Sequence, residues 1–241
     1  MGVMNDRTAL VTGANKGIGK HIARLLAAEG FGVYVGSRDA ARGRRAVEEI
    51  GGGARLLVLD VTDPDRIAAA AQQVCRLDVL VNNAGVSPSL APPTDTGTDD
   101  LRRTYETNVF GVVAVTNAFL PALRRSPRPR IVNVSSGTGS LTWSTRPNPQ
   151  FAPGSGGAAA YRSSKAALNA LTVLYARTLA EEGFKVNALA PGLRATDLNP
   201  RAAEAGGDPA EAARGAVRLA LLPDDGPTGG FFSWDGTPVP W

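Results

Sequence analysis

The fold is decided by the stretch Thr8-Ala-Leu-Val-Thr12-Gly-Ala-Asn-Lys-Gly-Ile-Gly19. Thr8 to Thr12 form an apolar run typical of a buried strand, and Lys20 to Glu29 repeat with helical periodicity. Glycines in the turn between them let the backbone approach a pyrophosphate, which the amides at the start of the helix can bind. The spacing is G-x-x-x-G-x-G and not G-x-G-x-x-G. By itself, the turn therefore also fits a strand-to-helix corner without a ligand.

A tyrosine and a lysine in Tyr161-Arg-Ser-Ser-Lys165 give the second signal. On a helix, residues one turn apart project from the same face, so the lysine ammonium can stand close to the phenol. An unperturbed phenol has a pKa of about 10, and a nearby positive charge lowers that pKa toward neutrality. The alternative, which a lone pair of this spacing would favour, is a surface tyrosine and a solvated lysine.

Length and composition limit the class of protein. The chain has 241 residues, 43% of them hydrophobic, and it contains no apolar run near the roughly 20 residues that cross a membrane. It shows neither internal repeats nor an interdomain linker, so we expect one domain over 1–241. Because the N-terminus does not resemble a signal peptide, we expect a cytoplasmic protein without membrane association.

Charge and reactive side chains exclude several functions. The net charge is +4, but basic and acidic residues are interleaved, as in 42–49, so we predict no nucleic-acid binding. Cys75 and His21 are the only residues of their kinds. An intramolecular disulfide, a thiolate or multi-histidine metal site and a Ser-His-Asp hydrolase are thereby excluded. We predict no metal, and we expect Cys75 to be buried in helix packing.

The remaining pattern alternates strands and helices. Buried apolar runs predict strands at Phe31–Gly36, Arg55–Leu59, Leu77–Val81, Arg130–Val134 and Lys185–Ala190, and a last strand within 228–241. Helical spacing predicts two long helices, over Asp99–Leu123 and Ala158–Glu182. This alternation predicts an α/β fold, with a doubly wound parallel sheet and right-handed crossovers.

Several motifs in a fixed order make the chain resemble a known family. The glycine turn is followed by Asn82-Asn-Ala-Gly85, Asn108, Ser136, the Tyr161 and Lys165 pair, and Pro191-Gly192. From about residue 7 to the C-terminus, this order resembles the classical short-chain dehydrogenases/reductases, and carbonyl reductases among them. The resemblance implies a single Rossmann-type domain with helices on both faces of the sheet and a nicotinamide cofactor.

The resemblance also implies a catalytic set made of Asn108, Ser136, Tyr161 and Lys165. Ser136 would donate a hydrogen bond to a substrate carbonyl, and Tyr161 would protonate it as general acid. Lys165 would lower the Tyr161 pKa and hold the ribose hydroxyls of the cofactor. Asn108 would bend its helix and hold a water that connects Lys165 to solvent; an Asn108 bonded within its own helix is the alternative. Because Ser135 precedes Ser136 directly, the two roles are open to exchange.

The end of the second predicted strand favours NADP(H). NAD enzymes usually place a carboxylate at this point, whereas this chain has Ser37 followed by Arg38. A guanidinium can bind a ribose 2′-phosphate through paired hydrogen bonds, and Lys16 in the glycine turn offers a second positive contact. Asp39 keeps the NAD alternative open, because a shift of one residue would bring its carboxylate to the ribose.

The family pattern implies a larger set of cofactor contacts: Gly13, Asn15, Lys16, Gly17, Ile18, Gly19, Ser37, Arg38, Asp60, Val61, Asn82, Ala84, Gly85, Tyr161, Lys165, Pro191, Gly192 and Thr196. Asp60 is expected at the adenine, and it also suits a cap for the helix that follows. Asn82 is expected to support the sheet beside the cofactor without direct chemistry. Thr196 is expected to contact the carboxamide.

The segment 141–157 departs from the family pattern, because it lengthens the interval between Ser136 and Tyr161. Its prolines predict a stiff, non-helical loop beside the active site. Together with Ser136, Trp143 and Phe151 are the expected substrate contacts, since aromatic side chains here would cover a flat, apolar substrate. Aromatics packed on the body of the protein are the alternative. Longer inserts in carbonyl-reductase-like relatives obstruct the dimerising helix, and the sequence leaves open whether this one does.

Together these features predict an NADPH-dependent carbonyl reductase that transfers hydride to a ketone or quinone, with an aromatic or polycyclic substrate favoured. The same residues acting in reverse would make an NADP-dependent alcohol dehydrogenase. A non-catalytic NADP(H)-binding regulatory protein is the alternative from another class. The aromatic tail within 228–241 would dock on the body or on a neighbouring subunit, so we predict a homo-dimer or homo-tetramer.

Overall fold

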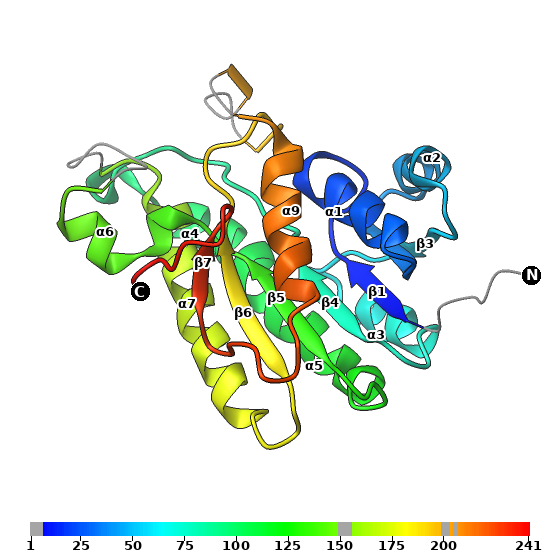
Figure 1. Ribbon diagram of the computed structural model, residues 1–241. Helices are drawn as coiled ribbons and strands as arrows, with labels where there is room; N and C mark the ends of the chain where they lie inside the picture. The colour runs from blue at the N-terminus through cyan, green and yellow to red at the C-terminus, as the bar shows by residue number, and fades with distance from the viewer. Residues whose placement is uncertain (1–6, 149–155, 199–202, 205–206) are drawn as a thin grey trace, which may run out of the picture.

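A parallel sheet forms the centre of the molecule. The computed structural model describes residues 7–148, 156–198, 203–204 and 207–241. Seven strands hydrogen-bond in the order β3-β2-β1-β4-β5-β6-β7, and every neighbouring pair is parallel (Figure 1). The strands are β1 (Thr8–Val11), β2 (Gly32–Ser37), β3 (Arg55–Val58), β4 (Val79–Asn82), β5 (Arg130–Val134), β6 (Lys185–Ala190) and β7 (Phe231–Ser233). The predicted α/β doubly wound fold is confirmed.

Helices cover both faces of the sheet. One face carries α1 (Gly17–Ala28), α2 (Ala40–Ile50) and α9 (Pro209–Ala220), and the other carries α3 (Pro64–Gln72), α5 (Gly111–Leu123) and α7 (Ala159–Thr178). Shorter elements are η1 (Pro93–Asp95), α4 (Thr98–Tyr105), η3 (Gly137–Gly139) and α6 (Leu141–Thr145). The strand order reverses between β1 and β4. The loops that follow these two strands therefore diverge and leave a crevice at their carboxyl ends.

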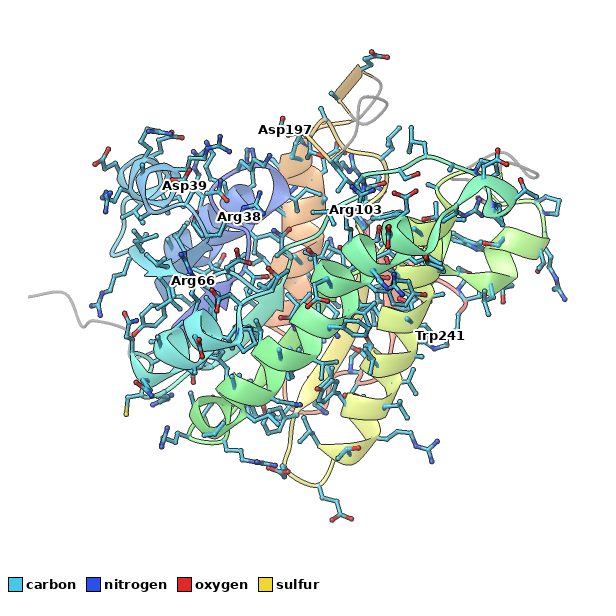
Figure 2. All side chains as sticks on the ribbon, turned by 180° about the vertical axis from the view of Figure 1, so that it is seen from behind. Arg38, Asp39, Arg66, Arg103, Asp197 and Trp241 are labelled. Atoms are coloured by element: carbon cyan, nitrogen blue, oxygen red, sulfur yellow. The ribbon has the colours of Figure 1, made fainter. Side chains whose placement is uncertain are left out.

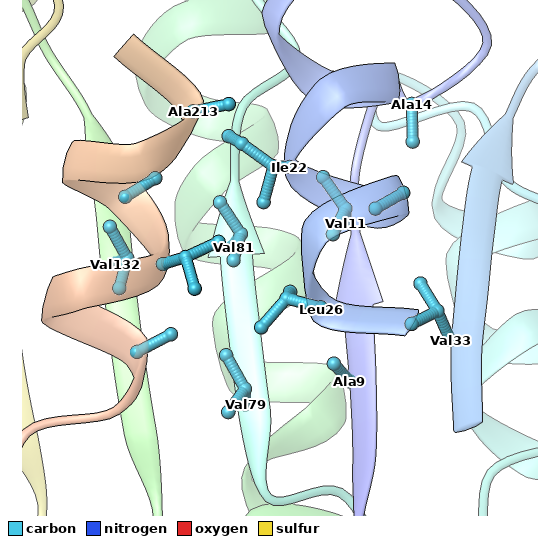
Figure 3. Close-up of a cluster of buried hydrophobic side chains, with 14 of the residues drawn as sticks. Ala9, Val11, Ala14, Ile22, Leu26, Val33, Val79, Val81, Val132 and Ala213 are labelled. Atoms are coloured by element: carbon cyan, nitrogen blue, oxygen red, sulfur yellow. The ribbon is translucent and has the colours of Figure 1, made fainter. Parts of the chain in front are cut away.

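Alternating side chains of the strands feed two cores. Ala9 and Val11 of β1 pack under Ile22 and Leu26 of α1, and α9 closes the same core from the side (Figure 3). Leu10, between them in sequence, belongs to the core on the opposite face, under α3 and α5. Both faces of the strands are thus buried, which explains why they read as nearly continuous apolar runs.

The long helix predicted over Asp99–Leu123 is interrupted. A π-helical turn, Glu106–Phe110, separates α4 from α5. Where α5 begins, Gly111 lies so close to the Val61 carbonyl oxygen that a Cβ would come within 2.7 Å of it. Because a π turn changes the angle at which side chains leave the helix, Asn108 is directed into the interior and is fully buried.

The segment 141–157 begins with a helix, which corrects the prediction of a wholly non-helical loop. The helix α6 ends before the prolines, and the Ser140 hydroxyl caps it by accepting a hydrogen bond from the Trp143 amide at 3.0 Å. Prolines disfavour helix at their own positions and at the residue before, so a short helix fits in front of them. Residues 149–155 lie outside the described part of the chain.

Cys75 is exposed, which corrects the expectation of a buried residue, because it lies in the loop after α3 has ended.

The aromatic tail docks on the body of its own chain. The Trp241 ring stacks on Phe231 of β7 with the ring centres 5.2 Å apart. The Thr142 amide of α6 donates to the Trp241 carbonyl oxygen at 3.1 Å. The tail thereby joins the last strand to α6.

Every helix in the described part of the chain is too short or too polar to span a bilayer. Among the same residues, the His, Cys, Asp and Glu side chains do not gather into a group of three or more that would hold a metal ion.

Candidate active site

A cavity of about 580 Å³ opens at the carboxyl ends of the central strands. This is the crevice in which open parallel sheets bind ligands. It is lined by sixteen of the residues expected to contact a cofactor, namely Gly13, Asn15, Lys16, Gly17, Ile18, Gly19, Ser37, Arg38, Asp60, Val61, Ala84, Gly85, Tyr161, Lys165, Pro191 and Thr196. Asn82 and Gly192 do not line it.

The Ser136 hydroxyl lies close enough to the Tyr161 phenol to lower the pKa of the phenol by hydrogen bonding. Tyr161 projects from the first turn of α7, and Ser136 lies between β5 and η3. The Ser136 oxygen also accepts a hydrogen bond from the Thr138 amide at 3.2 Å and lies 2.9 Å from the Thr138 hydroxyl. Two adjacent hydroxyls can both donate to one carbonyl oxygen.

Ser135 has a different environment from Ser136. It is fully buried, and its hydroxyl donates to Oδ1 of Asn169 on α7 at 2.6 Å. This hydroxyl is thus used to fasten α7 to the end of β5. Ser135 lines the cavity and Ser136 does not. The Ser135 hydroxyl is nevertheless occupied by Asn169, whereas Ser136 is only partly buried, so we favour Ser136 as the residue that meets a substrate.

Lys165 is almost completely buried, one turn after Tyr161. Its Nζ donates to the Val134 carbonyl oxygen at 2.8 Å and lies 5.6 Å from the centre of the Tyr161 ring. Burial lowers the pKa of Lys165 to about 8, because a charged form is disfavoured where water is excluded. An ammonium has three N–H donors and Val134 takes one, so two donors remain for a ligand in the cavity.

The Tyr161 pKa differs from the expectation. Burial raises the pKa of Tyr161 to about 12, and the hydrogen bond from Ser136 opposes this rise only in part. The same exclusion of water that favours neutral Lys165 disfavours a phenolate, so the lysine does not bring the Tyr161 pKa below its ordinary value here. Tyr161 therefore keeps its proton at neutral pH, which is the form that a general acid requires.

Asn108 clamps two other elements together. Its Nδ2 donates to the Val86 carbonyl oxygen and to the Ser164 hydroxyl, both at 3.0 Å, and its Oδ1 accepts from the Val86 amide at 2.9 Å. These partners lie outside its own helix, so the alternative of an Asn108 bonded within that helix is wrong. The side chain joins the loop after β4 to α7 at the residue before Lys165.

The glycine turn leads into an uncapped helix. Gly13 and Gly17 have φ values of +63° and +54°, in the left-handed region that glycine adopts without strain. Lys16 holds the N-cap position of α1 but makes no capping hydrogen bond with its side chain. The first amides of α1 therefore lack a side-chain partner, and an anion in the cavity can accept from them.

The Lys16 ammonium has a carboxylate partner in this structure. It pairs with Asp197 at 2.9 Å, and both side chains are more than half exposed, at 54% and 75%. Exposed pairs of this kind are weak. A phosphate carries more charge than a carboxylate and can replace Asp197 at Lys16.

Arg38 faces the cavity beside a capped helix. The neighbouring Ser37 hydroxyl donates to the Asp39 carbonyl oxygen at 2.8 Å, and the Asp39 carboxylate caps α2 by accepting from the Ala41 and Arg42 amides. Arg38 and Asp39 lie beside α2, on the side of the molecule away from Trp241 (Figure 2). Asp39 also lines the cavity, but its cap occupies one carboxylate oxygen, while Arg42 of the same helix adds a second guanidinium there.

Asp60 remains an acceptor inside the cavity. Its Oδ1 accepts from the amide and the hydroxyl of Thr62, and the helix cap that it was expected to provide comes from Asp63 instead. Burial raises the pKa of Asp60, but the Thr62 hydrogen bonds and the charges of Arg38 and Arg66 outweigh burial, so the net pKa is lowered. Asp60 is therefore ionised at neutral pH.

Asn82 and Gly192 support the cavity from behind its wall. The Asn82 Nδ2 donates to Oδ1 of Asn133 at 2.9 Å and to the Thr116 hydroxyl at 3.1 Å, which links β4, β5 and α5. Gly192 has a φ of +71°, and a Cβ there would lie 3.4 Å from the Trp234 ring. Both residues shape the loops that line the cavity.

Comparison with known proteins assigns the family. A family model described as short chain dehydrogenase matches residues 7–206. The chain belongs to the short chain dehydrogenase family. Salutaridine reductase from Papaver bracteatum is 34% identical over 299 aligned residues, which cover 95% of each chain. The structure of an NADPH-bound carbonyl reductase from chicken fatty liver has a TM-score of 0.82 and 29% identity, covering 98% of this chain and 99% of that one.

A 3-ketoacyl-(acyl-carrier-protein) reductase from Brucella melitensis, solved in complex with NADH, also has a TM-score of 0.82, at 25% identity over 96% of this chain and 97% of that one. Structural neighbours of this short chain dehydrogenase thus hold either form of nicotinamide cofactor. The residues described above fit such a dinucleotide: the first amides of α1 are uncapped, Lys165 has donors to spare, and Arg38 lies in the cavity. The protein is an oxidoreductase of this family.

Trp143, which was expected to contact a substrate, lies away from the cavity in this short chain dehydrogenase. Trp143 packs against the cluster of Ala188, Ala190, Phe231 and Val239, and it does not line the cavity. This placement supports the alternative in which aromatics of the segment pack on the body. Phe151 lies outside the described residues. The apolar side chains that line the cavity after β4 are Ala84, Val86 and Pro88.

Asn83 and Thr12 were absent from the predicted set, although together they hold the two loops of the crevice. The Thr12 hydroxyl accepts from the Asn83 and Ala84 amides, both at 2.9 Å, and Nδ2 of Asn83 donates to the Thr12 carbonyl oxygen at 2.9 Å. A Cβ at Gly19 would lie 2.3 Å from that Nδ2. The signal in the sequence was a hydroxyl at the end of the first strand and a second asparagine after the fourth.

Proposed function

We propose that the protein is an NADPH-dependent carbonyl reductase that transfers hydride to a ketone or quinone with an aromatic or polycyclic skeleton. The observation that carries this proposal is the cavity that Tyr161 and Lys165 line together with the glycine turn and Arg38, with the Ser136 hydroxyl close enough to Tyr161 to act on its pKa. The NADPH-bound carbonyl reductase and the relative named salutaridine reductase support the cofactor and the reductive direction.

The residues of the chain act on the oxygen of the substrate. Bound NADPH supplies the hydride. The hydroxyls of Ser136 and Tyr161 hydrogen-bond the carbonyl oxygen, and Tyr161 gives up its proton as negative charge develops there. The raised pKa of Tyr161 keeps the proton in place until that moment. Lys165, which is protonated below about pH 8, then stabilises the phenolate.

Arg38 supports NADPH over NADH. Arg38 and Arg42 both line the cavity near the end of β2, where they would hold the 2′-phosphate of a bound NADPH. Arginine binds phosphate through paired, charge-assisted hydrogen bonds. The carboxylate of Asp39, which would favour NADH, caps α2.

The proposed class of substrate is argued from the loop after β4, which forms one wall of the cavity. A Cβ at Gly85 would lie 3.6 Å from Nζ of Lys165, so this loop runs beside the catalytic set. Val86 and Pro88 follow Gly85 and give the cavity apolar surface at that point. A ring system can pack on them while its carbonyl reaches the two hydroxyls.

The test is oxidation of NADPH and of NADH by the purified protein, followed through the absorbance of the reduced nicotinamide. Aromatic ketones, quinones and aliphatic ketones serve as acceptors. We expect NADPH-selective turnover with an aromatic ketone or a quinone. Turnover that occurs only with NADP⁺ and an alcohol would replace the proposal by the dehydrogenase. Tight NADPH binding without turnover across the panel would favour the regulatory protein.

A further inference from the structure

Arg194 is a buried charge that ties three separate parts of the chain together. Its exposed fraction is 7%. Its Nε donates to the carbonyl oxygen of Pro191 in the loop after β6 at 2.6 Å, and its Nη1 donates to the Glu211 carboxylate on α9. The guanidinium also lies 4.5 Å from the centre of the Trp234 ring, directly after β7. Arg194 thus fixes the orientation of the loop after β6 against both α9 and the residue that follows β7.

The loop that Arg194 fastens is a wall of the cavity. Pro191, Ala195 and Thr196 line the cavity, whereas Arg194 does not. Thr196 reaches the glycine turn, since a Cβ at Gly17 would lie 3.3 Å from its methyl group. Arg194 therefore stands behind the residues that a cofactor would touch.

The backbone around Arg194 leaves room for the guanidinium and no more. A Cβ at Gly207 would come within 2.7 Å of its Nη1, and a Cβ at Gly192 would come within 3.4 Å of its Nη2. The Ala195 amide donates to the Gly207 carbonyl oxygen at 2.8 Å, and the Gly207 amide donates to the Leu193 carbonyl oxygen at 3.0 Å. The returning chain closes over Arg194 and holds the wall segment by its backbone.

An arginine suits this place better than any other residue. Its planar guanidinium offers donors in fixed directions, so that it can reach a carbonyl and a carboxylate at once and still stack on an indole. A lysine ammonium cannot do all three, and an apolar side chain would leave both acceptors without a donor. A buried charge also needs a partner of opposite sign, which Glu211 provides.

We propose that Arg194 is a positioning residue, which fixes the backbone from Pro191 to Thr196 in the conformation that receives the cofactor. It acts through Pro191 and Thr196, because its own side chain points away from the cavity toward α9 and Trp234. The identity of the cofactor in this inference rests on the proposed function.

The test compares Arg194→Met with Arg194→Lys and with Arg218→Met. Arg218 lies on α9 beside Gly236 and does not line the cavity, so it is a matched control. Amide exchange at Ala195 and Gly207 is measured without nucleotide, and the Kd for NADPH and the kcat are measured separately. In Arg194→Met we expect faster exchange at both amides and a Kd raised by roughly tenfold, as when a charge-assisted hydrogen bond is lost, with kcat at saturating NADPH nearly unchanged.

Arg194→Lys should fall between the wild type and Arg194→Met, and Arg218→Met should match the wild type. A lowered Tm with an unchanged Kd and unchanged exchange would overturn the inference and leave Arg194 a structural role alone. If Arg194→Met fails to fold, Glu211→Gln must show the same two increases, and a wild-type Kd in that variant would overturn it. If the wild type binds NADH and not NADPH, the proposed function is contradicted but the inference about Arg194 is not. The inference is then tested with the Kd for NADH and with amide exchange at Ala195 and Gly207.

Discussion

Tyr161 and Lys165 lie on the same face of α7, and burial shifts their pKa values in opposite directions. It raises the pKa of the phenol to about 12 and lowers that of the ammonium to about 8. Both shifts have one cause, because water exclusion disfavours whichever form is charged. At neutral pH the pair therefore holds a protonated phenol beside an ammonium. This is the state that the proposed reduction of a carbonyl requires.

Removal of the phenolic hydroxyl tests the general acid. We expect Tyr161→Phe to lower kcat by about 10²- to 10⁴-fold, the usual contribution of a positioned acid, while the Kd for NADPH stays nearly the same. Steady-state kinetics and fluorescence titration measure the two effects. Tyr175→Phe is the control, because that hydroxyl lies on the same helix and bonds to Asn117. Full activity in Tyr161→Phe would refute its role.

The pH dependence of reduction tests Lys165. Its folded pKa of about 8 means that the ammonium is present below that pH and is lost above it. Tyr161 stays protonated throughout this range, so we expect kcat/KM for reduction to be level at neutral pH and to fall as the pH rises through about 8. In Lys165→Arg the side chain keeps its charge. If Lys165→Arg is active and its kcat/KM still falls through the same pH range, the fall is caused by the titration of a group other than Lys165.

The choice of cofactor tests Arg38. We expect Arg38→Asp to raise the Kd for NADPH by about ten- to a hundredfold, since it removes charge-assisted hydrogen bonds to phosphate, and to improve the Kd for NADH. Titration with both nucleotides measures the shift. Arg44→Asp makes the same change in charge on an exposed position of α2 that does not line the cavity. An equal loss in both variants would indicate a general electrostatic effect and remove Arg38 from phosphate recognition.

At the scale of elements, the site depends on close contacts between short turns and long helices. The π turn before α5 directs Asn108 inward, and Asn108 holds the loop after β4 against α7. Behind Lys165, η3 lies against α7 so closely that only a glycine fits at residue 139. Asn108 and Gly139 thus hold α7, which carries Tyr161 and Lys165, against neighbouring elements.

A methyl group at the contact between η3 and α7 tests this dependence. In Gly139→Ala, the new Cβ would lie 2.8 Å from the Lys165 carbonyl carbon and 2.9 Å from its Cβ, so one element has to move. We expect the free energy of unfolding to fall by about 1–3 kcal/mol, as for other overpacked sites, and kcat to fall because Ser136 and Tyr161 separate. Gly97→Ala is the matched control, since nothing lies within 4 Å of its Cβ. Wild-type kinetics in Gly139→Ala would show that the contact does not position the catalytic set.

At the scale of the whole molecule, the two ends of the sheet differ in what they carry. The glycine turn and the side chains of Arg38 and Arg42 lie beside β1 and β2. Arg194, which binds the loop after β6, and the aromatic tail lie beside β6 and β7. The tail packs on its own chain, so its aromatic surface does not by itself require a second subunit. We still propose a homo-dimer or homo-tetramer, and sedimentation of the purified protein measures this oligomeric state.

The tail offers a separate test. We expect Trp241→Ala to lower the free energy of unfolding by about 1 kcal/mol or somewhat more, from the lost ring stacking and burial. The oligomeric state and the Kd for NADPH should not change, because Trp241 contacts Phe231 and lies outside the cavity. Chemical denaturation and sedimentation measure these properties. Leu141→Ala is the control on α6, where the side chain is 68% exposed. Dissociation of the oligomer in Trp241→Ala would show that the tail also serves an interface.

The sequence by itself determined the order of the strands, the glycine turn and sixteen of the residues that line the crevice. These features follow from periodicity and turn chemistry, which are local, and from the rule that parallel strands end at one edge. Only the tertiary structure decided the pKa of Tyr161, the inward direction of Asn108, the packing of Trp143 on the body and the pairing of Lys16 with Asp197. Each of these depends on burial or on contacts between residues far apart in the chain, which no local pattern records.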